Sequence, residues 1–108
     1  LEDIHSEHDH PLFDMSAVDG YAFAFQADIT DFKVVGDVAA GEFHAGMLAP
    51  GECVRIFTGA MVPEGADTVV MQERTSRDGD RMAYVDPALR EGSNVRKRGE
   101  QIRAGETV

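Results

Sequence analysis

The sequence lacks the features that define several large classes of protein. It contains no tryptophan and a single cysteine, Cys53, in 108 residues. One cysteine cannot form an internal disulfide, so a disulfide-stapled fold is excluded and a reducing compartment is compatible with the composition. No apolar run approaches the roughly 20 residues of a membrane-spanning helix. No basic segment followed by an apolar one marks a secretory signal.

Basic residues are scarce, and their distribution is uneven. The formal net charge is -10, and residues 1–50 contain ten acidic residues and one basic residue, Lys33. General binding to nucleic acid or to anionic membranes is therefore not expected. The one basic cluster could hold an anion locally, although a solvated charged edge strand is the plainer interpretation. That cluster consists of Arg96, Lys97, Arg98 and Arg103.

Helical periodicity is also missing, whereas strand patterns recur. No window of about 12 residues keeps an apolar helical face free of glycine or proline. The 11 glycines fall largely in loops between apolar, β-branched or aromatic runs. We therefore predict an all-β fold, a small barrel-like or two-sheet arrangement of twisted antiparallel and mixed strands. The expected strands are residues 21–25, 32–38, 53–57, 67–73 and 81–86, with a hairpin turn at "RDGD" (77–80) between the last two.

The composition is that of a folded domain, since 43% of the residues are hydrophobic. We expect residues 11–98 to form one β domain. Residues 1–10 are expected to be a polar lead-in from an upstream segment, and residues 99–108 an exit toward a downstream domain. The chain is thus predicted to be a fragment of a longer protein.

The stretch "PLFDMSAVDGYAF" (11–23) places a hydroxyl and a carboxylate, Ser16 and Asp19, at the mouth of an apolar run. Asp19 could hold a hydrated Mg²⁺ or orient a substrate group. Asp-Gly before a strand is also common turn chemistry, which is the plainer interpretation.

The stretch "RIFTGA" (55–60) ends a predicted strand in a compact turn. Thr58 offers a hydroxyl there, and the small residue Gly59 lets a ligand approach free backbone N–H groups, so the turn could cradle an anion. An ordinary Thr-Gly turn is the plainer interpretation.

Other candidate sites are weaker. "HSEHDH" (5–10) has neither a four-ligand spacing nor a cysteine partner, so a polar terminal stretch is favoured over a metal site. Glu100 follows the basic cluster and could act like Asp19 or merely pair with Arg98. No phosphate-binding glycine loop and no nucleophile elbow occurs, and Cys53 is expected to be a packing thiol inside a strand.

Three stretches, in this order and at these separations, carry a family resemblance: "PLFDMSAVDGYAF", "GECVRIFTGAMVPEGADTVVMQE" and "GSNVRKRGEQIRAGE". Together they closely resemble the second domain of the molybdopterin molybdotransferase family, which includes bacterial MoeA, the plant enzyme's E domain and the gephyrin E domain. The resemblance covers nearly the whole chain and is weakest in residues 27–45 and 75–89.

The resemblance implies a transferase of molybdenum cofactor biosynthesis. Members of the family insert molybdate into adenylylated molybdopterin in the cytoplasm, release AMP and require Mg²⁺. They work as homodimers of four-domain chains on small-molecule substrates, with no nucleic acid or membrane partner implied. The β domain forms one wall of the active-site cleft and the partner subunit supplies the other, so the isolated fragment is expected to be inactive.

The resemblance also assigns roles to residues. It implies catalytic roles for Asp19 and Thr58, with Asp19 as the Mg²⁺ ligand, and predicts that Asp19, Thr58 and the Arg96–Arg98 patch line a single exposed rim. The substrate-binding residues that follow from it are Ser16, Gly59, Arg96, Arg98 and Glu100.

The chain departs from the usual family pattern at four positions. Met15, Val18 and Met61 stand where the family commonly has Asn, Met and Pro. Gln101 replaces the usual aspartate of "GEDI", which removes a charge and retains hydrogen bonding. A divergent member with a non-catalytic β scaffold or assembly domain is therefore an alternative, and a generic small-molecule-binding β-barrel is a weaker one.

Overall fold

The structure is a computed structural model that describes residues 14–42, 44 and 46–97. Within this part of the chain all regular structure is β, apart from one short 3₁₀ helix, η2 (Gln72–Arg74). No helix among the described residues has the length and hydropathy needed to cross a bilayer. The strands are β1 (Met15–Ser16), β2 (Gly20–Phe23), β3 (Asp31–Val38), β4 (Glu52–Ile56), β5 (Thr68–Met71), β6 (Thr75–Asp78), β7 (Arg81–Tyr84) and β8 (Val95–Arg96).

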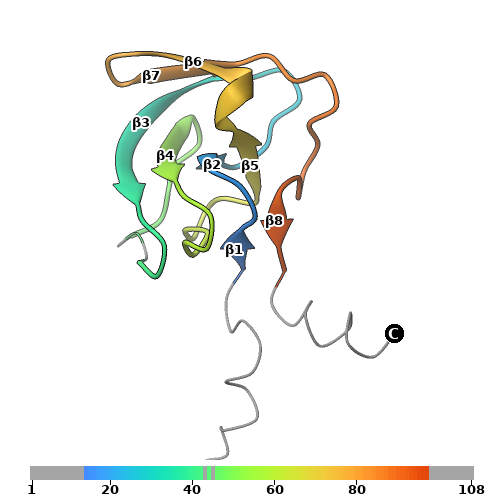
Figure 1. Cartoon of the computed structure of the whole chain (residues 1–108). Coiled ribbons are helices and arrows are strands. Elements are labelled where there is room, and N and C mark those ends of the chain that lie inside the picture. The colour runs from blue at the N-terminus through green and yellow to red at the C-terminus, as the bar shows by residue number, and fades with distance from the viewer. Residues whose placement is uncertain (1–13, 43, 45, 98–108) are drawn as a thin grey trace, which may run out of the picture.

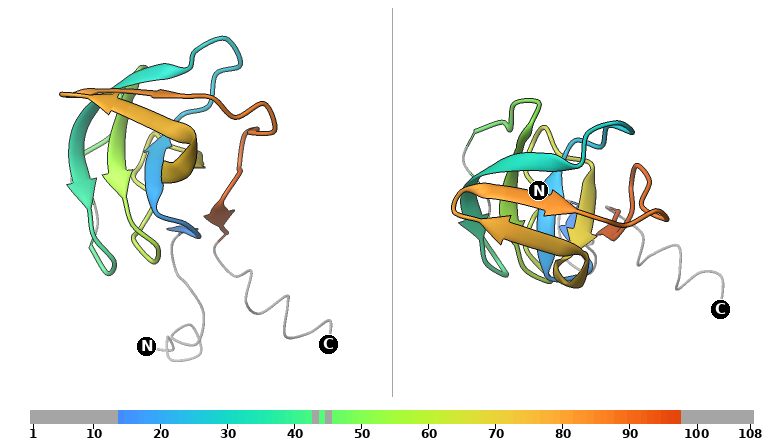
Figure 2. Two further views of the ribbon diagram at one scale, coloured as in Figure 1. Left: turned by 45° about the horizontal axis from the view of Figure 1, so that its top comes forward. Right: turned by 90° about the horizontal axis from the view of Figure 1, so that it is seen from above.

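Six of the strands form one strongly curled sheet in the order β5-β2-β4-β3-β7-β6, and β1 pairs with β8 in a separate two-stranded sheet. The curl makes a half-barrel, in which the β6–β7 hairpin folds across the end of the other strands (Figures 1 and 2). Strand pairs are antiparallel except β3 with β4, which are parallel. The prediction of an all-β, barrel-like mixed arrangement is confirmed.

Strand β2 is apolar throughout because it is central and buried on both faces. Successive side chains alternate between the faces. Tyr21 and Phe23 pack into one core cluster, whereas Ala22 packs into the other. The Phe23 ring stacks on Phe32 with a centroid separation of 4.2 Å, which fixes β2 against β3.

A β-bulge lets strand β3 contribute to both clusters. Val34 pairs with Cys53, but Asp37 rather than residue 36 pairs with Arg55, so β3 contains one extra residue. The extra residue switches the direction of the side chains that follow. Val34 therefore lies in the first cluster and Val38 in the second.

The predicted hairpin turn is confirmed, but its first strand was assigned wrongly. Strand β5 ends at Met71 instead of continuing to residue 73, and the chain then makes the turn of η2. The hydroxyl of Thr75 donates to the Gln72 carbonyl (2.8 Å) and closes this turn. Strand β6 then pairs with β7, and Asp78 lies opposite Arg81 across a two-residue connection. The expected strand at residues 81–86 likewise ends earlier, at Tyr84.

Cys53 is a packing thiol, as predicted. Its side chain is fully buried in the first core cluster. Burial raises the pKa of the Cys53 thiol to about 12, against the smaller opposing effect of the positive charges of Arg77 and Arg81. Cys53 can therefore react with a thiol reagent only when the domain opens, and labelling of Cys53 measures that opening.

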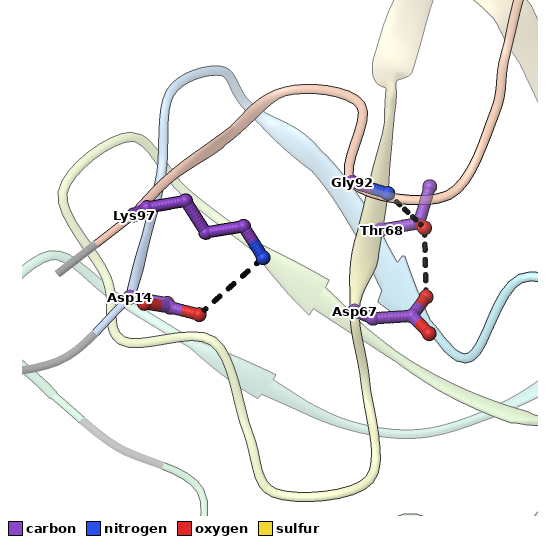
Figure 3. Close-up of polar contacts among 5 residues, drawn as sticks. All are labelled: Asp14, Asp67, Thr68, Gly92 and Lys97. Carbon is purple, nitrogen blue, oxygen red and sulfur yellow. Dashed lines mark hydrogen bonds and ion pairs between the residues drawn. The ribbon is translucent and has the colours of Figure 1, made fainter. Parts of the chain in front are cut away.

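The two ends of the described chain leave the domain side by side. Strands β1 and β8 pair with Met15 opposite Arg96, and beyond this pair Lys97 Nζ lies 3.9 Å from Asp14 Oδ2 (Figure 3). Both side chains of this ion pair are substantially exposed, so the pair itself adds little stability.

A buried hydroxyl attaches the segment before β8 to the edge of β5. Thr68 is fully buried, and its hydroxyl donates to Asp67 Oδ1 (2.7 Å) and accepts from the Gly92 N–H (3.1 Å; Figure 3). The same Asp67 oxygen accepts from the Phe25 N–H (2.9 Å). The chain therefore bends away after β2 at Phe23, two residues earlier than the sequence predicts.

Replacing Thr68 with valine is expected to destabilise the domain by about 1–3 kcal/mol, because the Gly92 N–H loses its acceptor in a site of unchanged shape. Labelling of Cys53 in increasing urea measures this loss as a lower midpoint. The matched control is Thr75→Val, since the Gln72 carbonyl released there is exposed and remains open to water. Equal midpoints for the two variants would contradict the role given to Thr68.

Candidate functional site

Asp19 lies in the turn between β1 and β2, and a buried hydroxyl shapes that turn. The hydroxyl of Ser16 donates to the Val18 carbonyl (2.6 Å) and accepts from the Val18 N–H (3.3 Å). Ser16 is only 3% exposed. Its hydroxyl therefore orients the segment that presents Asp19, and its assignment to substrate binding stays a prediction.

Asp19 and Thr58 are in direct contact, although 39 residues separate them in the sequence. Asp19 Oδ1 accepts from the Thr58 N–H (2.8 Å) and from the Thr58 hydroxyl (2.9 Å). On the other side, the Gln72 N–H donates to the Asp19 carbonyl (2.9 Å). The fold thus brings together the two residues for which the resemblance implied catalytic roles, and both are exposed.

The hydrogen bonds from Thr58 keep Asp19 ionised. The backbone N–H of Thr58 lowers the pKa of Asp19 most, followed by the Thr58 hydroxyl; desolvation opposes them by raising it, and the charge of Arg55 lowers it by the smallest amount of the four. Both bonds from Thr58 end on Oδ1, and no hydrogen bond to Oδ2 occurs within the described residues. The site is therefore a fixed carboxylate with one oxygen available to a ligand.

The turn after β4 is not the anion cradle that the sequence suggested. Its three N–H groups already donate within the protein, from Thr58 to Asp19, from Gly59 to the Ser16 carbonyl (2.9 Å), and from Ala60 to the Phe57 carbonyl (2.9 Å). The expectation of free N–H groups was wrong, because the acceptors for Thr58 and Gly59 come from a distant segment and Ala60 bonds locally to Phe57. Gly59 adopts φ +87°, a left-handed conformation that glycine tolerates best. Its assignment to substrate binding stays a prediction.

Arg96 lies on the other side of β1 from this turn. Met15 bridges to Met61 along one edge and to Arg96 along the other, so β1 separates the two. Arg96 is exposed and makes no hydrogen bond or ion pair with Asp19 among the described residues. Arg98 and Glu100 lie outside the described residues, as do Gln101 and the histidines of "HSEHDH". Of the predicted rim, the Asp19–Thr58 pair is observed and the basic part stays a prediction.

Sequence reasoning missed Arg55, whose positive charge lowers the pKa of Asp19. Arg55 lies in β4, opposite Tyr21 of β2, and its guanidinium is hydrogen bonded to segments on both sides of the site. One signal was available. In "CVRIF" Arg55 shares one strand face with Cys53 and Phe57, so the alternation puts a charged residue on an otherwise apolar face.

A dedicated metal cage is not present in the described part of the chain, where no three histidine, cysteine or acidic side chains gather. Asp19 offers one fixed oxygen and, within the described residues, one oxygen without a hydrogen bond, on an exposed side chain. Mg²⁺ usually keeps several waters and uses one or two carboxylates together with substrate phosphates. Asp19 fits this mode of binding and does not fit a site built only from protein ligands.

Replacing Thr58 with valine is expected to raise the pKa of Asp19 toward its ordinary value of 3.8, since the hydroxyl stabilises the charged form. The value should remain lowered, because the Thr58 N–H still donates. Asp19 contributes stability above its unfolded pKa, and this is lost as pH falls through the folded pKa, so in the variant the contribution is smaller and its loss is complete at a higher pH. A ¹³C NMR titration of the carboxyl measures the shift. Thr30→Val, at an exposed position, is the control, and an unchanged Asp19 titration in Thr58→Val would contradict the bond.

Comparison with known proteins places these residues in a family. The family model described as the MoeA N-terminal region (domain I and II) matches residues 1–108. A molybdopterin molybdenumtransferase of Nostoc sp. is 36% identical over 94% of this chain, one of Haemophilus influenzae is 37% identical over 99%, and gephyrin of Dictyostelium discoideum is 33% identical over 99%. The chain spans only 25%, 27% and 17% of these three relatives.

Solved structures agree with this assignment. Two structures of the molybdopterin biosynthesis MoeA protein from Pyrococcus horikoshii match with TM-scores of 0.72 and 0.74 at 38% and 32% identity. Each match covers 82% of this chain and about a quarter of the archaeal chain (24% and 25%). The curled sheet and the sequence thus lead to one conclusion: this chain belongs to the MoeA N-terminal region family of molybdopterin biosynthesis proteins.

Proposed function

We propose that this chain is the β domain of a molybdopterin molybdotransferase and forms one wall of its active-site cleft. The full protein inserts molybdate into adenylylated molybdopterin and releases AMP. Residues 11–98 form the domain, and the segments on either side continue into the rest of the protein. Because the other wall lies outside this domain, the fragment alone is inactive.

The observation that carries this proposal is the Asp19–Thr58 contact. Two hydrogen bonds fix Asp19 Oδ1 on an exposed surface and leave Oδ2 without a partner in the described residues. A surface carboxylate that only stabilised its own turn would not need two hydrogen-bond donors from Thr58, a residue 39 positions away in the sequence. Fixed placement of a charged group is what an oriented reaction site needs.

In this proposal Asp19 Oδ2 binds hydrated Mg²⁺ or orients the adenylylated substrate. When bound, Mg²⁺ would neutralise phosphate charge and polarise the bond that releases AMP. The Thr58 hydroxyl, whose hydrogen is committed to Asp19, offers only its lone pairs to a ligand. Thr58 therefore acts chiefly by holding Asp19 rather than by donating to an oxyanion.

The remaining roles rest on the resemblance. Arg96, with Arg98 and Glu100, would offset the charge of phosphate or molybdate at the far edge of β1. The protein would act in the cytoplasm as a homodimer whose partner subunit supplies the second cleft wall. These assignments add a basic region and a second subunit to the site formed by Asp19 and Thr58.

Single-turnover assay of the full-length protein tests the proposal. With adenylylated molybdopterin, Mg²⁺ and molybdate, AMP should appear, and omission of molybdate should abolish productive insertion. A full-length protein that binds neither molybdate nor AMP by calorimetry and releases no AMP would favour the non-catalytic scaffold alternative instead. An Arg96→Ala/Arg98→Ala variant is the comparison, since it should weaken anion binding without touching Asp19.

A further inference from the structure

We propose that Arg55 is a positioning residue that holds Asp19 and Thr58 in contact by clamping the three segments around them. The catalytic consequence rests on the proposed function, whereas the clamp itself is a property of this domain. Arg55 touches neither Asp19 nor Thr58 by a hydrogen bond, so it acts through their neighbours.

The guanidinium contacts the chain close to both Asp19 and Thr58. Nη1 donates to the Gly20 carbonyl (2.9 Å), immediately after Asp19, and to the Ile56 carbonyl (3.1 Å), two residues before Thr58. Its central carbon lies 4.3 Å from the centroid of the Phe57 ring, and Phe57 directly precedes Thr58. One planar group therefore fixes the start of β2 and the end of β4 together.

The third segment is η2. Arg55 Nη2 donates to Gln72 Oε1 (2.9 Å), and the Gln72 N–H in turn donates to the Asp19 carbonyl (2.9 Å). Asp19 is thus held at both ends, by Thr58 on its side chain and by Gln72 on its backbone, and Arg55 contacts both holding segments. Without Arg55 these segments are still joined by the bonds of Asp19, by the Gly59 N–H to the Ser16 carbonyl and by the strand pairing at Gly20, but they lose the side chain that contacts both holding segments.

Only the fork geometry of arginine can make this set of contacts. Two separate nitrogens point at two different segments while the flat face covers an aromatic ring. A lysine ammonium would keep the charge but reach one segment at a time. Arg55→Lys therefore separates the clamp from the electrostatic effect of the positive charge.

Arg77 provides a matched control within the same domain. Its guanidinium also lies over the Tyr21 ring, at 6.0 Å from the centroid compared with 5.4 Å for Arg55. Within the described residues its guanidinium hydrogen bonds to the Gly79 carbonyl of its own hairpin alone (2.8 Å). Arg77→Lys should therefore leave the Asp19–Thr58 contact unchanged.

Hydrogen exchange in the full-length protein tests the clamp without any assay of activity. The readout is the exchange rate of the two amides that bond Asp19, those of Thr58 and Gln72. In Arg55→Lys both should exchange about tenfold faster, as expected when hydrogen bonds of this kind lose their support. The amide of Val54, inside the core, and the urea midpoint of Cys53 labelling show whether the domain remains folded.

Enzyme assay with a double-mutant cycle tests the consequence. Arg55→Lys should lower kcat for AMP release roughly tenfold with little change in KM, because it displaces a fixed group rather than a binding contact. In an Asp19→Asn background the same substitution should have almost no further effect, since the two residues act as a unit. A purely structural role would lower activity equally in both backgrounds.

The outcomes separate the two proposals. Unchanged exchange of the Thr58 and Gln72 amides in Arg55→Lys, or equal acceleration in Arg77→Lys, would overturn the clamp whatever the assay shows. Full activity in Arg55→Lys would overturn the catalytic consequence of the clamp, because the positive charge alone would then suffice. Faster exchange in a protein whose wild type releases no AMP would sustain the clamp and reject the molybdotransferase proposal.

Discussion

Replacing Asp19 with asparagine in the full-length protein is expected to lower the rate of AMP release on the order of 10²–10³-fold, the loss typical of removing one preorganised charged group. The side chain keeps its shape, and its Oδ1 can still accept from the Thr58 N–H and hydroxyl, which lie 2.8 and 2.9 Å away. What disappears is the negative charge of the carboxylate, and an NH₂ donor replaces the second acceptor oxygen. Single-turnover measurement of AMP at saturating substrate gives the rate of the chemical step.

The control for this substitution is Asp28→Asn. Asp28 is an exposed aspartate for which no hydrogen bond is found within the described residues, so the same loss of charge there should leave turnover unchanged. If Asp19→Asn turned over at the wild-type rate, Asp19 would be removed from the mechanism. A rate recovered at higher Mg²⁺ concentration would assign Asp19 to metal binding rather than to orientation of the substrate.

The general fold was predictable because it depends on local patterns. Turns every few residues, runs of β-branched and aromatic residues and the absence of helical periodicity predict strands, and the "RDGD" turn is where the sequence places it. The continuous apolar run beginning at Tyr21 also has a local explanation, since a strand buried on both faces needs no polar side chains.

The arrangement of the strands was not predictable, because it depends on contacts between distant residues. No pattern in residues 31–38 predicts that β3 runs parallel to β4, or that a bulge follows Val34. The pairing of β1 with β8 joins segments from opposite ends of the described chain, and each is only two residues long. Such short strands carry almost no periodic signal of their own.

The candidate site shows the same division. Asp19 and Thr58 each resemble ordinary turn residues when taken alone, and only the ordered family motifs made them a pair. The motifs could not show that the N–H groups of Thr58 and Gly59 are already used, because their acceptors, Asp19 and the Ser16 carbonyl, come from the distant segment that precedes β2. Arg55 was missed for a related reason, since its importance arises from the three segments it joins and not from its own spacing.

Gly20→Ala is expected to destabilise the domain by about 3 kcal/mol or more, the upper range for overpacking a rigid site. A Cβ built at Gly20 would overlap the carbonyl oxygen of Val70 and lie 2.8 Å from its carbonyl carbon, inside the approach that real Cβ atoms make. Both atoms are backbone of β5, which pairs with β2 along its length, so the neighbour cannot simply rotate away. The lower entropy of the unfolded alanine chain, worth about 0.4–1 kcal/mol, is too small to compensate.

Gly36→Ala provides the matched control, because a Cβ there would lie 3.6 Å from the nearest atom, on the His44 ring, which is ordinary contact. Neither glycine has a positive φ, so the two substitutions differ in available space and not in backbone strain. Urea dependence of Cys53 labelling should show a much lower midpoint for Gly20→Ala than for Gly36→Ala, and similar midpoints would contradict the close packing of β2 on β5.

Because Gly20 directly follows Asp19, separation of strands β2 and β5 would also carry the Gln72 N–H away from the Asp19 carbonyl. The glycine of this turn is therefore needed for the close strand approach that fixes the carboxylate beside it.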